Sequence, residues 1–188
     1  MSSDIFSRPV DVSKFDLIYA GAQKNMGTAG ATLVIIKKDI IGKHGKKIPT
    51  MMDYKTHLDN DSLYNTPPVL AILIAMYTLE WVKSIGGVKE MEKLNQAKYD
   101  LFYGEVDNNP LFYGTAATED RSPMNACFLL KDNTLDEEFL AATKAEGIIG
   151  IKGHRSVGGF RASMYNALPI ESVKVLTDVM KAFAQKKG

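Results

Sequence analysis

The residue with the clearest chemical potential is Lys24, which lies in a segment rich in glycine and small residues. Short apolar segments at 15–20 and 31–36 flank it, so the pattern predicts two strands joined by a tight loop. Desolvation between two buried strands penalises the charged form of a lysine and makes its amine nucleophilic. Glycines on both sides would let a flat ligand approach the backbone. The same pattern also fits a lysine at a turn tip that points into water.

A second group of candidate residues consists of His154, Arg155 and Arg161, on a glycine-rich turn and at the start of a predicted strand. The chain has nineteen lysines but only four arginines, so two arginines this close together stand out. A guanidinium fork binds carboxylate or phosphate through two hydrogen bonds, which an ammonium cannot copy. The group therefore predicts a clamp for a substrate with a phosphate and a carboxylate, although a solvated basic loop has the same composition.

Asn65 and Thr66 come directly before Pro67-Pro68, where an apolar pattern begins that is typical of a helix. A helix N-terminus with a hydroxyl group beside it is suited to bind a phosphate. The two residues thus form a third candidate site, for which a plain helix cap is the simpler interpretation.

Other motifs point away from chemistry. Gly150-Ile151-Lys152-Gly153 matches the Gly-x-x-Gly loop of RNA-binding KH modules, but the residues that follow it oppose the required helix. His44 and His57 have no partners at metal-ligand spacing, so we expect surface histidines and no metal site. Cys127 lies in an apolar run and is expected to be a buried structural thiol.

Composition narrows the classes of partner. The net charge is +1 and the charged residues of both signs are interspersed, which favours neither nucleic acid nor an anionic membrane as a partner. The longest apolar run is far shorter than the roughly 20 residues of a membrane span, and the first residues do not resemble a secretory signal. A single cysteine excludes an internal disulfide. We therefore expect a cytoplasmic protein.

The glycine pair at 86–87 divides the chain into two expected domains, 1–86 and 87–188. In the first, two strands and a polar excursion at 42–62 precede a helix that ends near 85, which is too little for a complete sheet. The second is expected to form a small α+β domain with helices on one face of a sheet. Its predicted elements are a helix at 88–106, a strand at 124–130, a helix at 135–146, strands at 148–151 and 159–163, and a helix at 169–185.

Three segments resemble motifs of phosphoserine aminotransferases. Residues 19–25 resemble the lysine motif of that family, residues 64–68 its second cofactor motif, and residues 153–167 its substrate-phosphate motif. Three long motifs in this order are specific, and the likeness covers the whole chain. The resemblance implies an α/β fold of the aspartate-aminotransferase type. Residues 1–86 would be the C-terminal part of the large cofactor-binding domain, with a mixed sheet, and residues 87–188 the small α+β domain.

The resemblance also implies a cofactor, pyridoxal 5'-phosphate (PLP), held as a Schiff base by Lys24, which later moves the proton between the substrate α-carbon and the cofactor. Gln23 would help to hold the cofactor phosphate. Asn65 and Thr66 would reach the phosphate of a PLP in the neighbouring subunit, which implies a homodimer.

On the substrate side, the resemblance implies that His154 and Arg155 bind the substrate phosphate and that Arg161 grips the α-carboxylate. The reaction would be transfer of the amino group of glutamate to 3-phosphohydroxypyruvate, which yields phosphoserine and 2-oxoglutarate in serine biosynthesis.

The family's N-terminal portion is expected to lie outside this chain, together with the aromatic residue that stacks on PLP and the aspartate that pairs with its pyridinium nitrogen. We therefore expect little or no aminotransferase activity from the chain alone. Two alternatives stay open. One is a PLP enzyme of the same fold with other chemistry, such as a desulfurase or a kynureninase-like enzyme, whose substrates carry no phosphate for His154 and Arg155 to bind. The other is a non-catalytic fragment that mediates association.

Overall fold

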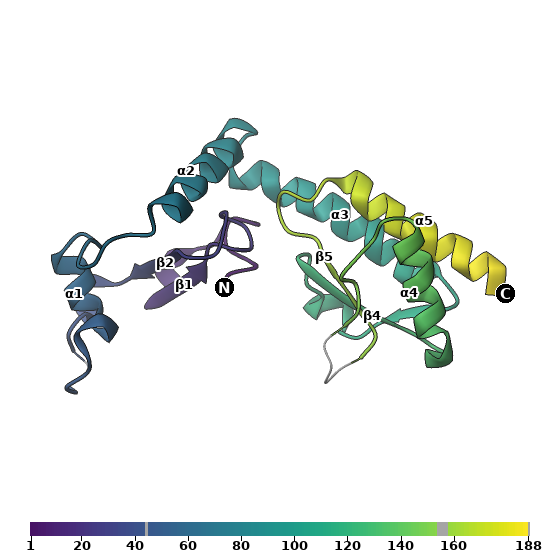
Figure 1. Cartoon of the computed structure of the whole chain (residues 1–188), viewed down its shortest axis with the longest axis horizontal. Coiled ribbons are helices and arrows are strands. Elements are labelled where there is room, and N and C mark those ends of the chain that lie inside the picture. Colours follow the sequence, from purple (N-terminus) through teal and green to yellow (C-terminus); the bar gives the residue numbers. More distant parts are fainter. Residues whose placement is uncertain (44, 154–157, 188) are drawn as a thin grey trace. The chain divides into compact units, whose positions relative to one another are not determined.

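The computed structural model describes residues 1–43, 45–153 and 158–187 (Figure 1). The chain divides into two compact units, Met1–Gly87 and Val88–Gly188, each with its own hydrophobic core. The break lies beside the expected boundary at Gly86 and Gly87. Both glycines have positive φ angles, 112° and 77°, which residues with a side chain rarely adopt. The glycine pair therefore ends the preceding helix at this point.

The unit Met1–Gly87 is built around an antiparallel strand pair and one long helix. Strand β1 (Leu17–Gly21) pairs with β2 (Thr32–Ile36), as the two apolar segments around Lys24 predict. The polar excursion that follows contains a short helix, α1 (Tyr54–Asp59), which the sequence pattern did not predict. Helix α2 (Val69–Ser84) comes last. The mixed sheet expected for a large domain is not seen among the described residues of this unit.

Helix α2 buries little of its apolar surface within its unit. Only Ala71 and Val82 are buried, while Val69, Leu70 and Tyr77 are 66%, 69% and 59% exposed. Contiguous apolar surface of this kind is typical of a contact with another protein surface. Among the described residues, no single helix has the length and apolar character to cross a membrane. Only α2 and the helix after it, taken together as a bent pair, reach that length and composition.

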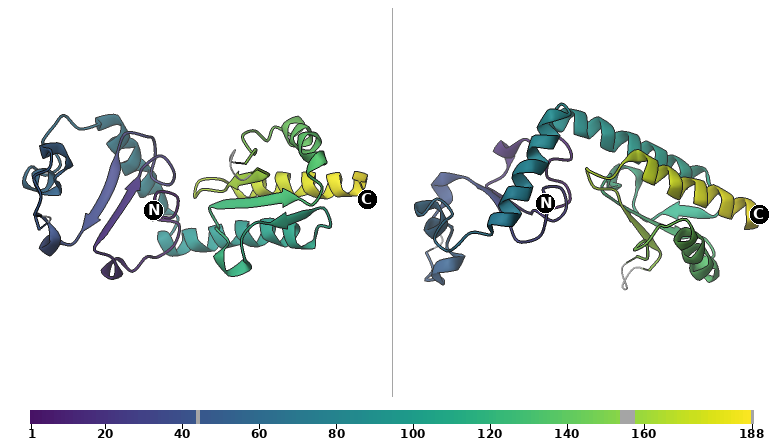
Figure 2. Two further views of the ribbon diagram at one scale, coloured as in Figure 1. Left: turned by 90° about the horizontal axis from the view of Figure 1, so that it is seen from below. Right: turned by 45° about the horizontal axis from the view of Figure 1, so that its top comes forward.

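The unit Val88–Gly188 packs three helices on one face of a three-stranded sheet (Figure 2). The strands lie in the order β3-β4-β5 and all pairs are antiparallel. Helices α3 and α5 lie side by side. The elements are α3 (Val88–Asn108), β3 (Phe112–Gly114), β4 (Asn125–Leu130), α4 (Asp136–Ala145), β5 (Phe160–Ser163) and α5 (Ile170–Lys187).

Aromatic rings form the centre of this core. The ring centroid of Phe128 on β4 lies 5.2 Å from that of Phe102 on α3 and 5.3 Å from that of Phe160 on β5. Phe139 on α4 lies 4.9 Å from Phe160. Burial alternates along β4, so one face of the sheet turns toward all three helices. The expected α+β unit is therefore present.

Two strand predictions for this unit were wrong. Strand β3 was missed, and residues 148–151 were predicted as a strand but form none. The described backbone there makes one isolated bridge, between Lys152 and Phe160, and Ile149 is 83% exposed. A short apolar run does not reveal whether a ladder partner is within reach.

Candidate active site

Lys24 lies on a turn that leaves β1 and returns to β2. The carbonyl of Ala22 accepts hydrogen bonds from the amides of Met26 and Gly27, at 3.0 and 2.9 Å, which winds residues 22–27 into a helical turn. In this turn Ala22, Asn25 and Met26 point inward and are buried, whereas Gln23 and Lys24 are exposed. The turn thus presents Gln23 and Lys24 to solvent from a backbone that its buried residues anchor.

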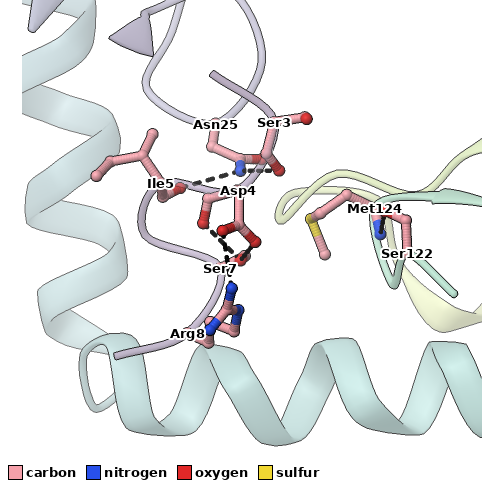
Figure 3. A network of polar contacts seen from close by, with 8 residues as sticks. All are labelled: Ser3, Asp4, Ile5, Ser7, Arg8, Asn25, Ser122 and Met124. Carbon is pink, nitrogen blue, oxygen red and sulfur yellow. Dashed lines mark hydrogen bonds and ion pairs between the residues drawn. The ribbon is translucent and has the colours of Figure 1, made fainter. Parts of the chain in front are cut away.

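Asn25 fixes the turn to the first residues of the chain (Figure 3). Its side-chain amide is buried and donates to the carbonyl oxygens of Ser3 and Ile5, each 3.0 Å away. Beside these bonds, the carboxylate of Asp4 accepts a hydrogen bond from the hydroxyl of Ser7 and forms an ion pair with the guanidinium of Arg8, with 3.0 Å between nitrogen and oxygen. The turn that carries Lys24 is therefore anchored, through Asn25, to residues 3–5.

Two glycines decide how closely the turn packs. Gly27 has a φ angle of 147°, and a Cβ atom there would lie 2.9 Å from the side chain of Ile74 on α2. Its lack of a side chain lets the turn contact the helix directly. Gly21 leaves the space into which the side-chain amide of Gln23 folds back, because a Cβ atom there would overlap that amide.

The expectation that Lys24 is partly desolvated is not met within this chain, where its side chain is exposed. The other part of the expectation, a lysine on a tight small-residue turn between two strands, is observed. The described residues therefore position the amine of Lys24 on a turn, but they do not enclose it in a pocket.

Asn65 and Thr66 lie before α2 rather than at its first turn, and both are exposed. The helix begins at Val69, its N-cap is Pro68, and no side chain caps it. Asn65 donates to the carbonyl of Thr66 at 3.1 Å. The prediction of a threonine cap was wrong because each of the two prolines disfavours helical backbone at the residue before it, so the helix begins only after Pro68. That Asn65 and Thr66 bind a phosphate stays a prediction.

Arg161 lies on β5 with its side chain exposed, between buried Phe160 and Ala162. It is opposite Cys127 in the register of β4 and β5, so the two share the outer face of the sheet. Its amide donates to the carbonyl of Ile151 at 2.8 Å. His154 and Arg155, the other two members of the predicted clamp, lie outside the described residues.

A cavity of about 410 Å³ opens beside β5, and Arg161, Ser163 and Met164 contribute to its lining together with residues 146–151 and α5.

Cys127 is half-buried on the outer sheet face rather than buried as expected. Among the described residues no cluster of histidine, cysteine or acidic side chains could hold a metal. His57 is half-exposed and its Nε2 lies 3.0 Å from the carbonyl oxygen of Met51.

Sequence reasoning missed the polar residues that hold these elements in place. Asn25 carries the lysine turn, and Asn95 and Lys98 on α3 are 2% exposed. Arg121 pairs with Asp107 through two hydrogen bonds of 2.7 and 2.8 Å. The scarcity of arginine was a usable signal for Arg121. No local pattern marks the others, because their partners are distant in the sequence.

Comparison with known proteins indicates the family to which the chain is related. A family model described as class-V aminotransferase matches residues 1–176. A phosphoserine aminotransferase from Flavobacterium johnsoniae is 61% identical over 186 residues, and one from Porphyromonas gingivalis is 55% identical over 188 residues. Each match covers 99% of this chain but 52% of the relative, so the chain spans about half the length of these curated relatives.

Solved structures agree in fold. The phosphoserine aminotransferase from Bacillus circulans subsp. alkalophilus superposes with a TM-score of 0.96 at 44% identity, over 100% of this chain and 52% of that one. A PLP-bound phosphoserine aminotransferase from Trichomonas vaginalis gives 0.90 at 40% identity, over 96% of this chain and 52% of that one. Since the family model covers nearly the whole sequence, the chain belongs to the class-V aminotransferase family.

Proposed function

We propose that the chain supplies the lysine and the substrate arginines of a phosphoserine:2-oxoglutarate aminotransferase. The enzyme would convert 3-phosphohydroxypyruvate and L-glutamate into O-phospho-L-serine and 2-oxoglutarate. The observation that carries the proposal is the position of Lys24, on a turn held by buried Asn25, in a chain 61% identical to a phosphoserine aminotransferase over nearly its full length. The substrates and partners of the whole protein are part of the same proposal.

The residues of the lysine turn fit pyridoxal phosphate. Lys24 is exposed on the turn and carries an amine that can hold an aldehyde covalently, and the space left by Gly21 keeps the polar amide of Gln23 close to the same backbone. Gln23, Asn65 and Thr66 would hold the cofactor phosphate, the last two across a subunit boundary. When bound, pyridoxal phosphate supplies an electron sink for negative charge that develops on the substrate α-carbon.

The side chains of the chain then have distinct tasks. The Nζ atom of Lys24 would take the proton from the substrate α-carbon and return it, a role for which a positioned amine is suited. Arg161 would bind the α-carboxylate through its guanidinium fork. His154 and Arg155 would bind the substrate phosphate. Together these contacts would orient the α-carbon toward the lysine.

A homodimer is part of the proposal, and the exposed apolar surface of α2 supports it. Leu70 and Tyr77 are 69% and 59% exposed within their own unit, and such surface favours burial against a partner. The proposal includes a cytoplasmic location, which suits a chain with a single cysteine. The same exposed helix also favours the second candidate, a non-catalytic fragment that mediates association.

Covalent labelling separates the two candidates. The chain is mixed with pyridoxal phosphate, reduced with borohydride and digested, and the labelled lysines are identified by mass spectrometry. We expect the label to concentrate on Lys24 and to disappear from that peptide in Lys24→Ala. Lys38→Ala, which removes an exposed lysine just after β2, is the matched control. Label spread evenly over the surface lysines would favour the association fragment.

Turnover tests the reaction itself. The chain is fused to the part of the Flavobacterium johnsoniae relative that it does not match, and phosphoserine formation from 3-phosphohydroxypyruvate and glutamate is measured. We expect turnover by the fusion protein, little or none by the chain alone, and a loss of at least about 10²-fold in the Lys24→Ala fusion. A fusion protein without turnover, while the intact relative is active in the same assay, would contradict the proposal.

A further inference from the structure

Helix α3 presents two polar side chains to the core of its unit. Its buried positions recur every three or four residues, as expected for one face of a helix, but two of them are Asn95 and Lys98, each 2% exposed. A buried ammonium group loses its hydration, and this loss is tolerated only where hydrogen bonds replace the water. The partners of Lys98 therefore indicate what it holds.

Those partners are successive residues of the segment that leaves β5. The Nζ atom of Lys98 donates to the carbonyl oxygens of Met164 at 3.0 Å and Tyr165 at 2.9 Å. The side-chain amide of Asn95 donates to Oδ1 of Asn166 at 3.0 Å. Two neighbouring positions on the buried face of α3 thus bind three consecutive residues.

The same segment is also bound to β4. The amide of Met164 donates to the carbonyl of Met124 at 2.8 Å, and the hydroxyl of Tyr165 donates to Oδ1 of Asn125 at 3.0 Å. Residues 164–166 therefore hold the C-terminal end of β5 in register with β4 on one side and against α3 on the other. Within this segment, Lys98 is the residue that connects α3 to the backbone carbonyls of Met164 and Tyr165.

Arg161 lies three residues before this segment, on the same short strand. Because side chains alternate along a strand, a slip of one residue in β5 would turn Arg161 from the outer face into the core. Arg161 and Met164 also line the same cavity of about 410 Å³. Because only two residues separate Arg161 from Met164, a shift of the backbone at Met164 after loss of these bonds would also displace Arg161.

We propose that Lys98 is a positioning residue: its amine fixes the segment after β5, and so fixes the place from which Arg161 reaches the α-carboxylate of the substrate. The inference rests on the proposed function, in which Arg161 binds that carboxylate. A methionine would fill a similar volume in the core without the cost of burying an amine. The use of lysine there is explained by its donors to the two carbonyl oxygens.

Hydrogen exchange tests the first half of this inference on the chain itself, without reference to activity. We expect Lys98→Met to speed amide exchange in residues 160–168 about tenfold, because the carbonyls of Met164 and Tyr165 lose their donor. Lys98→Gln, which keeps two N–H donors on a neutral group, should have a smaller effect and remains usable if the methionine variant does not fold. Lys93→Met, at an exposed lysine of the same helix, should leave exchange unchanged. Unchanged exchange in Lys98→Met would overturn the inference.

A double-mutant cycle in the fusion protein tests the second half. The measured quantity is KM for glutamate, which carries an α-carboxylate and no phosphate. Lys98→Met and Arg161→Gln should each raise KM about tenfold or more, and Lys98→Met should add little once Arg161 is replaced. Independent, multiplying effects would overturn the inference, because Lys98 would then act elsewhere. An unchanged KM in Arg161→Gln would contradict the proposed role of Arg161 itself, whatever hydrogen exchange has found.

Discussion

Asn25 Nδ2 lies 3.0 Å from the carbonyl oxygen of Ile5, and this bond connects the lysine turn to a segment twenty residues earlier in the chain. A second bond of the same length reaches Ser3. The amide therefore serves two backbone acceptors, and no other neutral side chain of the same shape donates two hydrogen bonds. Asn25 lies next to the candidate Schiff-base lysine and holds the turn that carries it. Replacing Asn25 therefore changes the position of Lys24 while the amine itself is kept.

Asn25→Asp should destabilise the unit Met1–Gly87 by about 2–3 kcal/mol, because a carboxylate cannot donate to the two carbonyls it would face. Trp81 is the single tryptophan of the sequence and belongs to this unit, so its fluorescence reports urea unfolding. Asn60→Asp is the control, since Asn60 is exposed and donates one bond to Thr56. Equal urea midpoints for the two variants would show that the Asn25 bonds contribute nothing.

Gly27→Ala should destabilise the same unit by about 2–4 kcal/mol and reduce labelling of Lys24 by pyridoxal phosphate. The added Cβ would meet Ile74 at 2.9 Å and the backbone of α2 at 3.3 Å, in addition to the strain of a positive φ angle. Gly42→Ala is the matched control. Its φ angle is 76°, but the nearest atom, on Lys55, is 3.8 Å away, so we expect a loss of about 1 kcal/mol. Equal losses would mean that contact between turn and helix does not matter.

Local pattern predicted much of the fold because the relevant signals are local. The strands on either side of Lys24, helix α3 and helix α5 follow from apolar periodicity, and the break at 86–87 follows from two glycines with positive φ. The interior of α3 was predicted less well. Apolar character alone would place Leu94 inward and Lys98 outward, but Leu94 is 45% exposed and Lys98 is buried.

The reason for that error is physical. The carbonyls that accept from Lys98 belong to residues 66 and 67 positions further along the chain, and no pattern within one helix contains this information. For the candidate site the division is similar. The lysine turn was visible in the sequence, but Asn25 was not, because its acceptors are backbone carbonyls that any residue type supplies.

Arg121→Lys should destabilise the unit Val88–Gly188 by about 1–2 kcal/mol. The guanidinium is 9% exposed, makes two hydrogen bonds with Asp107 and lies 4.7 Å from the ring centroid of Tyr103, and an ammonium cannot reproduce this geometry. Arg8→Lys, at an arginine that is 53% exposed, should change stability little. Guanidinium unfolding followed by circular dichroism provides the comparison.

The effect of Arg121→Lys should also depend on pH. The hydrogen bond from Arg121 holds the pKa of Asp107 below its ordinary value, so the pair stabilises the fold above that ordinary value and less as pH falls through the lowered pKa. The difference between wild type and Arg121→Lys should therefore shrink in acid. A difference that stays constant from neutral pH to pH 3 would contradict the assignment to this ion pair.

Lys98 should make the unit Val88–Gly188 more stable as pH rises through the mildly alkaline range. Burial lowers the pKa of Lys98 to about 8 from its ordinary value of 10.5, so between these values the unfolded chain binds more protons than the folded one. The free energy of unfolding then increases with pH, by about 2 kcal/mol between pH 7.5 and 9.5. Well below pH 7 the amine is charged in both states and the slope disappears. Lys98→Met lacks this contribution, so the free energy of unfolding of wild type relative to Lys98→Met should rise over that interval, while the value relative to Lys93→Met should not. Guanidinium unfolding at several pH values measures both differences, and a pH-independent gap between wild type and Lys98→Met would show that the buried amine does not titrate in this range.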